Sequence, residues 1–244
     1  MWASFGWGVV AASSLVVGAV VALVFRVSHR WIGLILAFGA GVLISAVAFD
    51  LVEEATATTS SHWPVYIGIF AGCGVFYVGD LLIERMGGES RKNPKGGGDD
   101  EGSPLAIVLG TVLDGVPESM VIGLTIYAGG EVGLAYLAAV LLSNLPEAIS
   151  STSGLVASGW RTQRIIGMWV AIAIVSGVAS MAGYGLFQNS SPGVVAFVLT
   201  FAAGAILTML ADTMMPQAYA YGGNLVGVVT TLGFASALLI HTLE

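Results

Sequence analysis

Residues 104–128 read PLAIVLGTVLDGVPESMVIGLTIYA, and residues 132–157 read VGLAYLAAVLLSNLPEAISSTSGLVA. Each stretch is long enough to cross a bilayer, because a hydrocarbon core of about 30 Å takes about 20 apolar residues of helix. Each stretch also has a Pro-Glu pair near its centre, at residues 117–118 and 146–147. The sequence therefore predicts two neighbouring membrane-spanning helices that place carboxylates at mid-membrane.

The composition of the whole chain agrees with a membrane protein. Hydrophobic residues make up 56% and charged residues 9% of the 244 residues, and the mean hydropathy is +0.89. A soluble domain has about 25% charged residues, so this chain has too few charges to cover a water-facing surface. The net charge of −7 provides no basic surface for a polynucleotide. These figures exclude a soluble enzyme, a nucleic-acid binder and a disordered protein, and they make the lipid bilayer the expected partner.

Further apolar segments of similar length predict an all-α fold with eight transmembrane helices. The segments are approximately 6–26, 31–53, 64–86, 104–128, 132–157, 164–187, 193–215 and 223–242.

The long connection between the third and fourth segments, residues 87–103, is rich in glycine and charge and has no apolar periodicity, which predicts a flexible solvated loop. We therefore divide the chain into helices one to three (1–86), the loop (87–103), the central helices four and five (104–158) and helices six to eight (159–244).

The basic residues predict the orientation of the spans. All of them lie in or beside the first, third and fifth connections: Arg26, Arg30, Arg85, Arg91, Lys92, Lys95, Arg161 and Arg164. Because Lys and Arg are retained on the cytoplasmic side, these connections, including the 87–103 loop, are expected in the cytoplasm. Both termini are then expected outside.

Three acids occupy the middle of the central helices: Asp114, Glu118 and Glu147. No Lys or Arg occurs between residues 96 and 160. Ionisable groups at this depth are costly and are usually functional. They must be protonated, face water or bind a cation.

The spacing of these acids favours a cation. Asp114 and Glu118 are four residues apart and share one helix face. Each proline also frees the carbonyl four residues before it, and a freed carbonyl at membrane depth needs a neighbour, water or an ion. Acids one turn apart facing a second kinked helix indicate a cage for a divalent cation. The alternative is a pair of kinked packing helices whose acids are protonated and hydrogen-bonded.

A weaker internal match predicts an inverted repeat. Residues 163 positions apart correspond in the second and seventh segments: Phe38 with Phe201, Gly41 with Gly204, and Ala55 with Ala218. The two segments would run in opposite directions, so helices one to three and six to eight would be related by inversion around the central pair. This is a recurring design of transporters, with the binding site at the midplane. Chance similarity between small-residue apolar helices is the alternative.

Acids near the ends of these two segments are candidates for an ion pathway. Asp50, Glu53 and Glu54 lie toward the outer end of the second segment, where they would gather cations. Asp212 lies toward the inner end of the seventh segment, where it would receive a departing ion. For Glu53 and Glu54 a simple solvated helix end is the alternative.

These features resemble the ZIP (Zrt/Irt-like protein) family of divalent metal transporters. That family has eight spans in a 3+2+3 arrangement, outside termini and a long cytoplasmic loop between spans three and four. Its hallmark is a His-Asn-x-Pro-Glu-Gly motif in span four and a related Pro-Glu motif in span five. Here the two positions read DGVPES at 114–119 and SNLPEA at 143–148, so the family's His and Asn are replaced by Asp114 and Gly115.

The resemblance implies a set of ligands and a cargo. Asp114, Glu118 and Glu147 would be the direct metal ligands, with Ser143 and Asn144 as weaker ones, in one principal site. The family favours Zn²⁺, with Fe²⁺, Mn²⁺, Co²⁺ and Cd²⁺ as alternatives, and an all-oxygen site shifts the preference toward harder ions such as Mn²⁺. A homodimer is implied by the resemblance alone.

The sequence thus predicts a multi-pass protein of the cell membrane (plasma or inner) that takes up a divalent metal ion by alternating access and is not an enzyme. A membrane metal sensor or scaffold that binds without transporting is the first alternative. An intramembrane metalloenzyme is less favoured, because no His-Glu-x-x-His motif occurs.

Overall fold

The computed structural model describes residues 1–25, 27–85, 104–129, 132–187 and 190–243. The predicted loop 87–103 lies outside these residues. So do four of the bases used for orientation, namely Arg26, Arg91, Lys92 and Lys95.

The described residues form helices joined by short turns, and no strand occurs among them. Apolar helix-forming residues fill the long helices, and proline stands at the start of α4 and α8, where its missing N–H costs nothing. The elements are α1 (Trp2–Val24), α2 (His29–Ala46), η1 (Val47–Glu53), α3 (Glu54–Thr58), α4 (Trp63–Ile83), α5 (Pro104–Gly129), α6 (Leu134–Ala157), α7 (Thr162–Leu186), α8 (Pro192–Met209), η4 (Leu210–Met214), α9 (Met215–Gly222), η5 (Gly223–Leu225) and α10 (Val226–Leu243).

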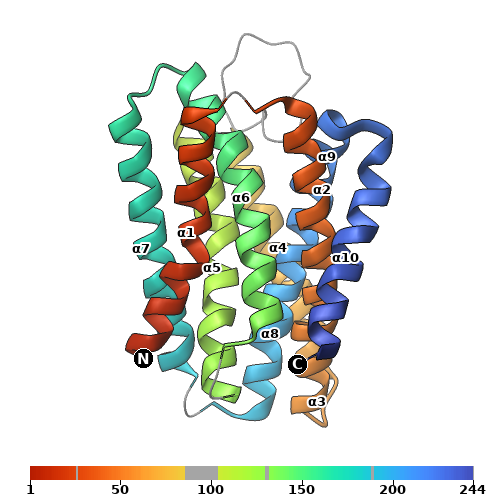
Figure 1. Ribbon diagram of the computed structural model, residues 1–244. Coiled ribbons are helices and arrows are strands. Elements are labelled where there is room, and N and C mark those ends of the chain that lie inside the picture. The colour runs from red at the N-terminus through yellow and green to blue at the C-terminus, as the bar shows by residue number, and fades with distance from the viewer. Residues whose placement is uncertain (26, 86–103, 130–131, 188–189, 244) are drawn as a thin grey trace.

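The long helices run up and down one bundle, and both chain termini lie at the same end of it (Figure 1). We call this the termini end and the other the opposite end. Among the described residues, 7 helical stretches are long and apolar enough to cross a membrane. The last of them, Pro192–Leu243, reverses direction at Gly223, whose φ of +65° glycine adopts readily. The predicted all-helical membrane fold is confirmed at this level.

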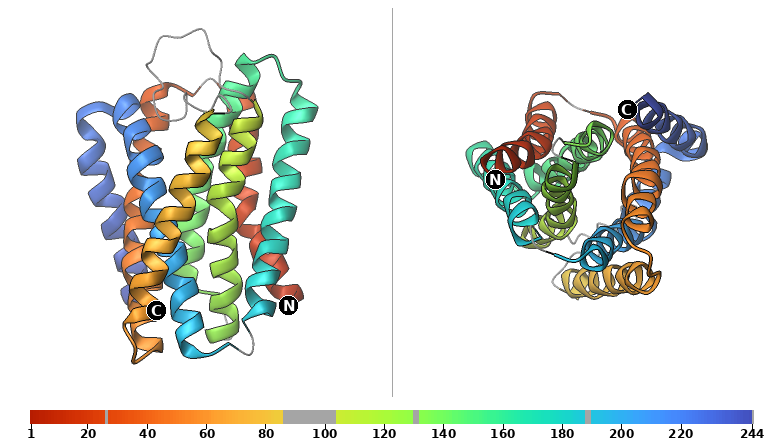
Figure 2. Two further views of the ribbon diagram at one scale, coloured as in Figure 1. Left: turned by 180° about the vertical axis from the view of Figure 1, so that it is seen from behind. Right: turned by 90° about the horizontal axis from the view of Figure 1, so that it is seen from below.

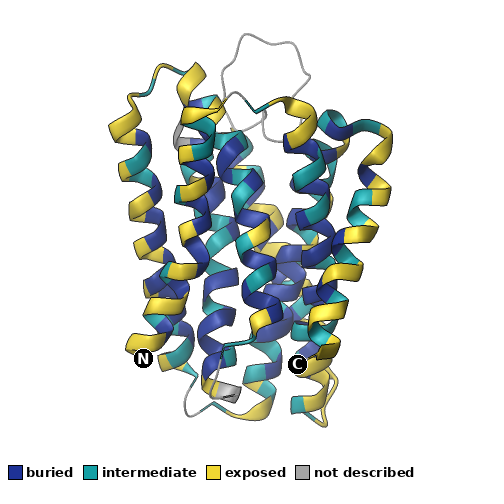
Figure 3. Cartoon of the chain, in the orientation of Figure 1, coloured by how far each residue is buried: buried dark blue, intermediate teal, exposed yellow. Residues whose placement is uncertain are grey.

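The outer surface of the bundle is apolar. Exposed residues lie on its outward faces, whereas buried residues line the inside (Figure 3). Trp2, Trp63 and Phe70 are each at least 74% exposed. A water-soluble protein rarely leaves so much large apolar surface uncovered, so this surface suits lipid.

Seen along the bundle, the helices form two groups (Figure 2). In the first helix group, α1 packs against α6 and α7, and α7 packs against α5. In the second helix group, α2 packs against α10, and α8 packs against α4. The groups meet where α2 contacts α6 and where α8 contacts α5.

Close helix contacts recur at positions that match in the predicted repeat. Gly41 of α2 lies against the backbone of Thr230 in α10, and Gly204 of α8 lies against the backbone of Ile69 in α4. A Cβ atom at either glycine would collide with the facing carbonyl oxygen. Small residues allow such close approach of membrane helices, and the two glycines are one of the pairs aligned above.

Two segments of π-helix, η1 and η4, occupy corresponding positions as well. They begin at Val47 and Leu210, which are separated by the same offset as the aligned residues. The π-helix is rare and often marks functional sites. Asp50 and Glu53 lie in η1 and Asp212 lies in η4, so three of the four acids predicted along an ion pathway stand in irregular helix. Nothing in the sequence pattern indicated these segments.

Candidate metal centre

The predicted central acids come from α5 and α6 of the first helix group. Both helices continue through an internal proline, Pro117 in α5 and Pro146 in α6. The side chains of Asp114 and Glu118 are 6% and 2% exposed, and Glu147 is half-buried. Each helix therefore holds a carboxylate inside the bundle, next to its proline.

The three carboxylates lie near one another. The charge of Glu147 acts on Glu118 most strongly among the neighbouring charges, followed by that of Asp114. Because like charges repel more strongly in a buried setting than in water, the cluster is unfavourable when all three acids are ionised. A divalent cation would turn this repulsion into attraction.

Glu118 provides a further sign of an incomplete site. Its Oε2 atom is buried and accepts no hydrogen bond from the described part of the chain. A buried acceptor without a donor costs about 1–3 kcal/mol. Such an atom is suited to a proton, a water molecule or an ion.

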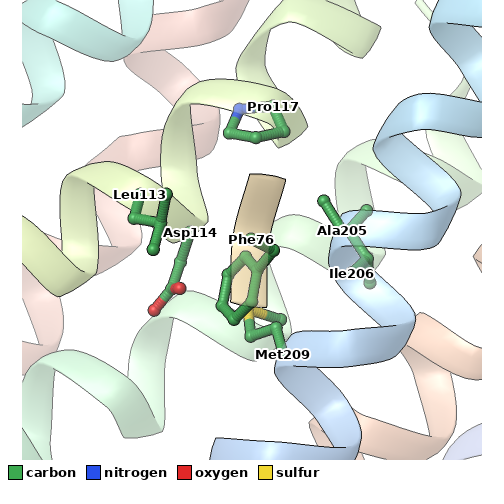
Figure 4. Close-up of a pocket in the computed structure, with 7 residues that line it drawn as sticks. All are labelled: Phe76, Leu113, Asp114, Pro117, Ala205, Ile206 and Met209. Carbon is green, nitrogen blue, oxygen red and sulfur yellow. The ribbon is translucent and has the colours of Figure 1, made fainter. Parts of the chain in front are cut away.

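Asp114 opens onto a small recess between α4, α5 and α8, where the two helix groups meet (Figure 4). Among the described residues, Asp114 is the only charged one in the lining, which also contains Phe76, Leu113, Pro117, Ala205, Ile206 and Met209. The Asp114 carboxylate is thus placed at the boundary between the groups.

The weaker candidate ligands are also buried in this region. Ser143 and Asn144 are 4% and 6% exposed. The Ser143 hydroxyl donates to the carbonyl of Val140 at 3.1 Å, which leaves its oxygen available as an acceptor. Gly39 of α2 packs close to the backbone of Ser143, so this part of α6 also lies at the boundary between the groups.

The arrangement is not a ready coordination sphere. Among the described residues, no three His, Cys, Asp or Glu side chains are grouped closely enough to hold one metal ion. The acids are neighbours, but side chains must move before they share an ion.

The predicted pathway acids lie away from this centre. Asp50 is 15% exposed and contacts His241 of α10. Glu53 and Glu54 are exposed toward the termini end, and the hydroxyl of Thr58 donates to the carbonyl of Glu54 at 2.8 Å. Asp212 is half-buried in η4. The structure therefore distributes these acids along the bundle and does not bring them into the central cluster.

Two residues near the central acids and Asp50 were not predicted as site residues. Tyr136 of α6 is 1% exposed, and the charges of both Glu118 and Asp50 act on its hydroxyl. Tyr136 precedes Ser143 by two helical turns on one face, which is a signal that the sequence does contain. His241 is 191 residues from its partner Asp50, and no sequence pattern indicates that pairing.

Polar contacts also occur toward the opposite end. Gln217 of α9 donates to the hydroxyl of Ser150 in α6 at 2.6 Å. The ring of His29 stacks on Tyr221, with centroids 4.9 Å apart. The first contact links α9 to α6 about one turn beyond Glu147, and the second links α2 to α9.

No protein-family model matches the chain, and no curated protein matches it significantly. The long apolar helices and their outward-facing apolar surface define a multi-pass membrane protein.

Proposed function

We propose that the protein transports a divalent transition-metal ion across the membrane into the cytoplasm, in the manner suggested by its resemblance to the ZIP family. In this proposal eight helices cross the bilayer, with the termini end outside. The ion binds at mid-membrane to Asp114, Glu118 and Glu147, and the oxygens of Ser143 and Asn144 assist.

The observation that carries the proposal is the burial of Glu118 beside two other acids. Its carboxylate is 2% exposed and is acted on by the charges of Glu147 and Asp114. The helices α5 and α6 contain no Lys or Arg. A cluster of acids inside a membrane is energetically costly, and such clusters are usually functional. A divalent ion would supply the positive charge that these helices lack.

The repeated packing supports alternating access. Helices α2 and α8 each meet their partner through a corresponding glycine, and each leads into a π-helix at the same offset. Such pairs are expected of an inverted repeat around a central site. The two helix groups then move relative to each other, and the ion passes from Asp50, Glu53 and Glu54 outside, through the centre, to Asp212 inside.

The cargo is a divalent transition metal, with Zn²⁺ favoured by the resemblance. The central ligands are all oxygens, and oxygen ligands suit Mn²⁺ as well as Zn²⁺. A panel that includes Zn²⁺, Mn²⁺, Fe²⁺, Co²⁺ and Cd²⁺ is therefore the appropriate set of probes.

The decisive experiment is metal uptake into proteoliposomes by the wild type, Glu118→Ala and Glu147→Ala. We expect both variants to lose at least about tenfold in uptake, because even supporting partners of a metal site cost that much. The control is Glu84→Gln, which removes an acid directly after the end of α4, outside the centre. Uptake that survives both central substitutions would exclude the central site.

A metal sensor or scaffold is the second candidate. The acids of the described residues do not form a ready coordination sphere. This favours a sensor, because the site of a sensor can assemble only when the metal binds. Metal bound by purified protein and lost in Asp114→Ala, without uptake of any ion by the wild type, would establish this candidate instead.

A further inference from the structure

The residues Asp50 and His241 form a polar pair toward the termini end, between η1 and the last turn of α10. The Nδ1 atom of His241 lies 3.1 Å from Oδ1 of Asp50. The imidazole ring also stacks on Phe49, with centroids 5.4 Å apart and planes at 30°. The side chain of His241 is 34% exposed and that of Asp50 is 15% exposed. The pair is therefore held in place and is still accessible from the termini end.

The spacing of this pair fits two ligands of one metal ion. Ligand atoms about 2.0–2.1 Å from a common ion are separated by roughly 2.9 Å at a right angle and roughly 3.4 Å at the tetrahedral angle. The observed 3.1 Å lies between these limits. An ion can therefore bind both atoms without their moving apart, once the imidazole ring turns so that Nδ1 points at the ion.

An independent observation relates one buried polar group both to this pair and to the centre. The hydroxyl of Tyr136 is buried and makes no hydrogen bond within the described part of the chain. The charges of Asp50 and Glu118 both act on it. A buried hydroxyl normally has a hydrogen-bond partner. The hydroxyl of Tyr136 is therefore suited to contact a passing ion or a water molecule bound to that ion.

We propose that Asp50 and His241 form an outer divalent-cation site, separate from the central carboxylates, in which one imidazole nitrogen and one carboxylate oxygen hold a partly hydrated ion. The ion moves from this site past the hydroxyl of Tyr136 to Glu118. Imidazole suits Zn²⁺ and Co²⁺ better than Mn²⁺, so the outer site selects among ions that the oxygen-lined centre accepts. Binding by the pair stands alone, whereas its place in uptake rests on the proposed function.

The three histidines of the chain make the test specific. In protein with ¹⁵N-labelled histidine, at about pH 7.5 where an ordinary imidazole is neutral, Zn²⁺ is expected to shift the ring resonances of His241. His29, stacked on Tyr221 toward the opposite end, and the exposed His62 serve as internal references. The shift is expected to persist in Glu118→Gln, because the two sites are separate.

Asp50→Asn separates a metal site from a simple tether between η1 and α10. Asparagine keeps the acceptor oxygen and the hydrogen bond but removes the charge, so Zn²⁺ affinity at His241 should fall about tenfold or more. His241→Gln should bind one Zn²⁺ fewer per chain than the wild type. A His241 resonance that ignores Zn²⁺, or that responds equally in Asp50→Asn, would overturn the proposal and leave a tether.

Measurements of Zn²⁺ uptake distinguish the proposed outer site from the proposed transport function. His241→Gln should raise the half-saturating Zn²⁺ concentration about tenfold while keeping the maximal rate, since it weakens capture and leaves the centre intact. A fall in maximal rate alone would contradict a capture role. If wild-type protein shows the Zn²⁺ response of His241 but transports no ion, the proposed function fails and the outer site stands.

Discussion

Glu118 is held at a cost that packing alone does not explain. Its side chain is 2% exposed, one of its oxygens has no hydrogen bond within the described residues, and two neighbouring carboxylates repel it when all three are ionised. Each of these features disfavours the folded state. A residue that only filled space here would be better replaced by an apolar side chain of similar length.

This reasoning yields a prediction that separates stability from function. Glu118→Met removes the buried acceptor and the repulsion, so the metal-free protein should gain about 1–3 kcal/mol and unfold at a higher temperature, while metal uptake is lost. Thermal unfolding in one detergent, measured with and without a chelator, checks this.

The matched control is Glu147→Met. As a residue Glu147 is half-buried, whereas Glu118 is 2% exposed, so the removal of Glu147 should stabilise the protein less than the removal of Glu118. A lower unfolding temperature for Glu118→Met would mean that this carboxylate stabilises the fold through its neighbours, and the reading of Glu118 as a functional group would lose its main support.

At the residue scale the sequence predicts neighbours along one helix and misses partners across helices. The spacing of Asp114 and Glu118 and the shared Pro-Glu pairs predict one cluster of acids from α5 and α6. In the structure the charges of Glu147 and Asp114 act on Glu118, but no three acids of the described residues are grouped closely enough to hold one ion. The pairing of His241 with Asp50 depends on how α10 packs against α2, and periodicity does not encode that packing.

At the element scale, Gly41 and Gly204 are two of the glycines that allow close contacts within the second helix group. Gly41 and Gly204 each face the backbone of a neighbouring helix with no room for a Cβ atom. Because protein interiors are close-packed, an added methyl group there must push the helices apart. The two contacts hold α2 to α10 and α8 to α4.

Gly41→Ala and Gly204→Ala should therefore destabilise the protein by similar amounts, about 1–3 kcal/mol each. Gly74→Ala is the control, because a Cβ at Gly74 meets nothing within 4 Å and alanine favours helix by about 1 kcal/mol over glycine. Apparent unfolding temperatures of the three variants test this. If Gly74→Ala were as damaging as the other two, the effect would not come from helix contact.

Helix positions follow from the apolar segments, while the interruptions within helices do not. The segment expected to end near residue 53 continues through η1 into α3, which ends at Thr58. A π-helix inserts a residue into the helical turn without changing the composition, so hydropathy cannot reveal it. Its recurrence at Val47 and Leu210 is visible only once the backbone is placed.

At the scale of the whole molecule, charge is distributed unevenly between the two ends. The described bases lie toward the opposite end, beside the start of α2, the end of α4 and the turn from α6 to α7: Arg30, Arg85, Arg161 and Arg164. The exposed acids Glu53 and Glu54 lie toward the termini end. In the proposed orientation, an entering cation meets these acids first and the bases lie on the cytoplasmic side.

This asymmetry predicts which end faces the cytoplasm, and single cysteines can measure it. Cys73 is the only native cysteine, so Cys73→Ala provides a cysteine-free background. We expect a membrane-impermeant maleimide to label Ser61→Cys, exposed before α4 toward the termini end, in intact cells. Thr162→Cys, exposed at the start of α7, should react only after permeabilisation. The reverse pattern would place Asp50 and His241 in the cytoplasm and turn the proposed uptake into export, whereas labelling of both sites in intact cells would argue against a spanning bundle.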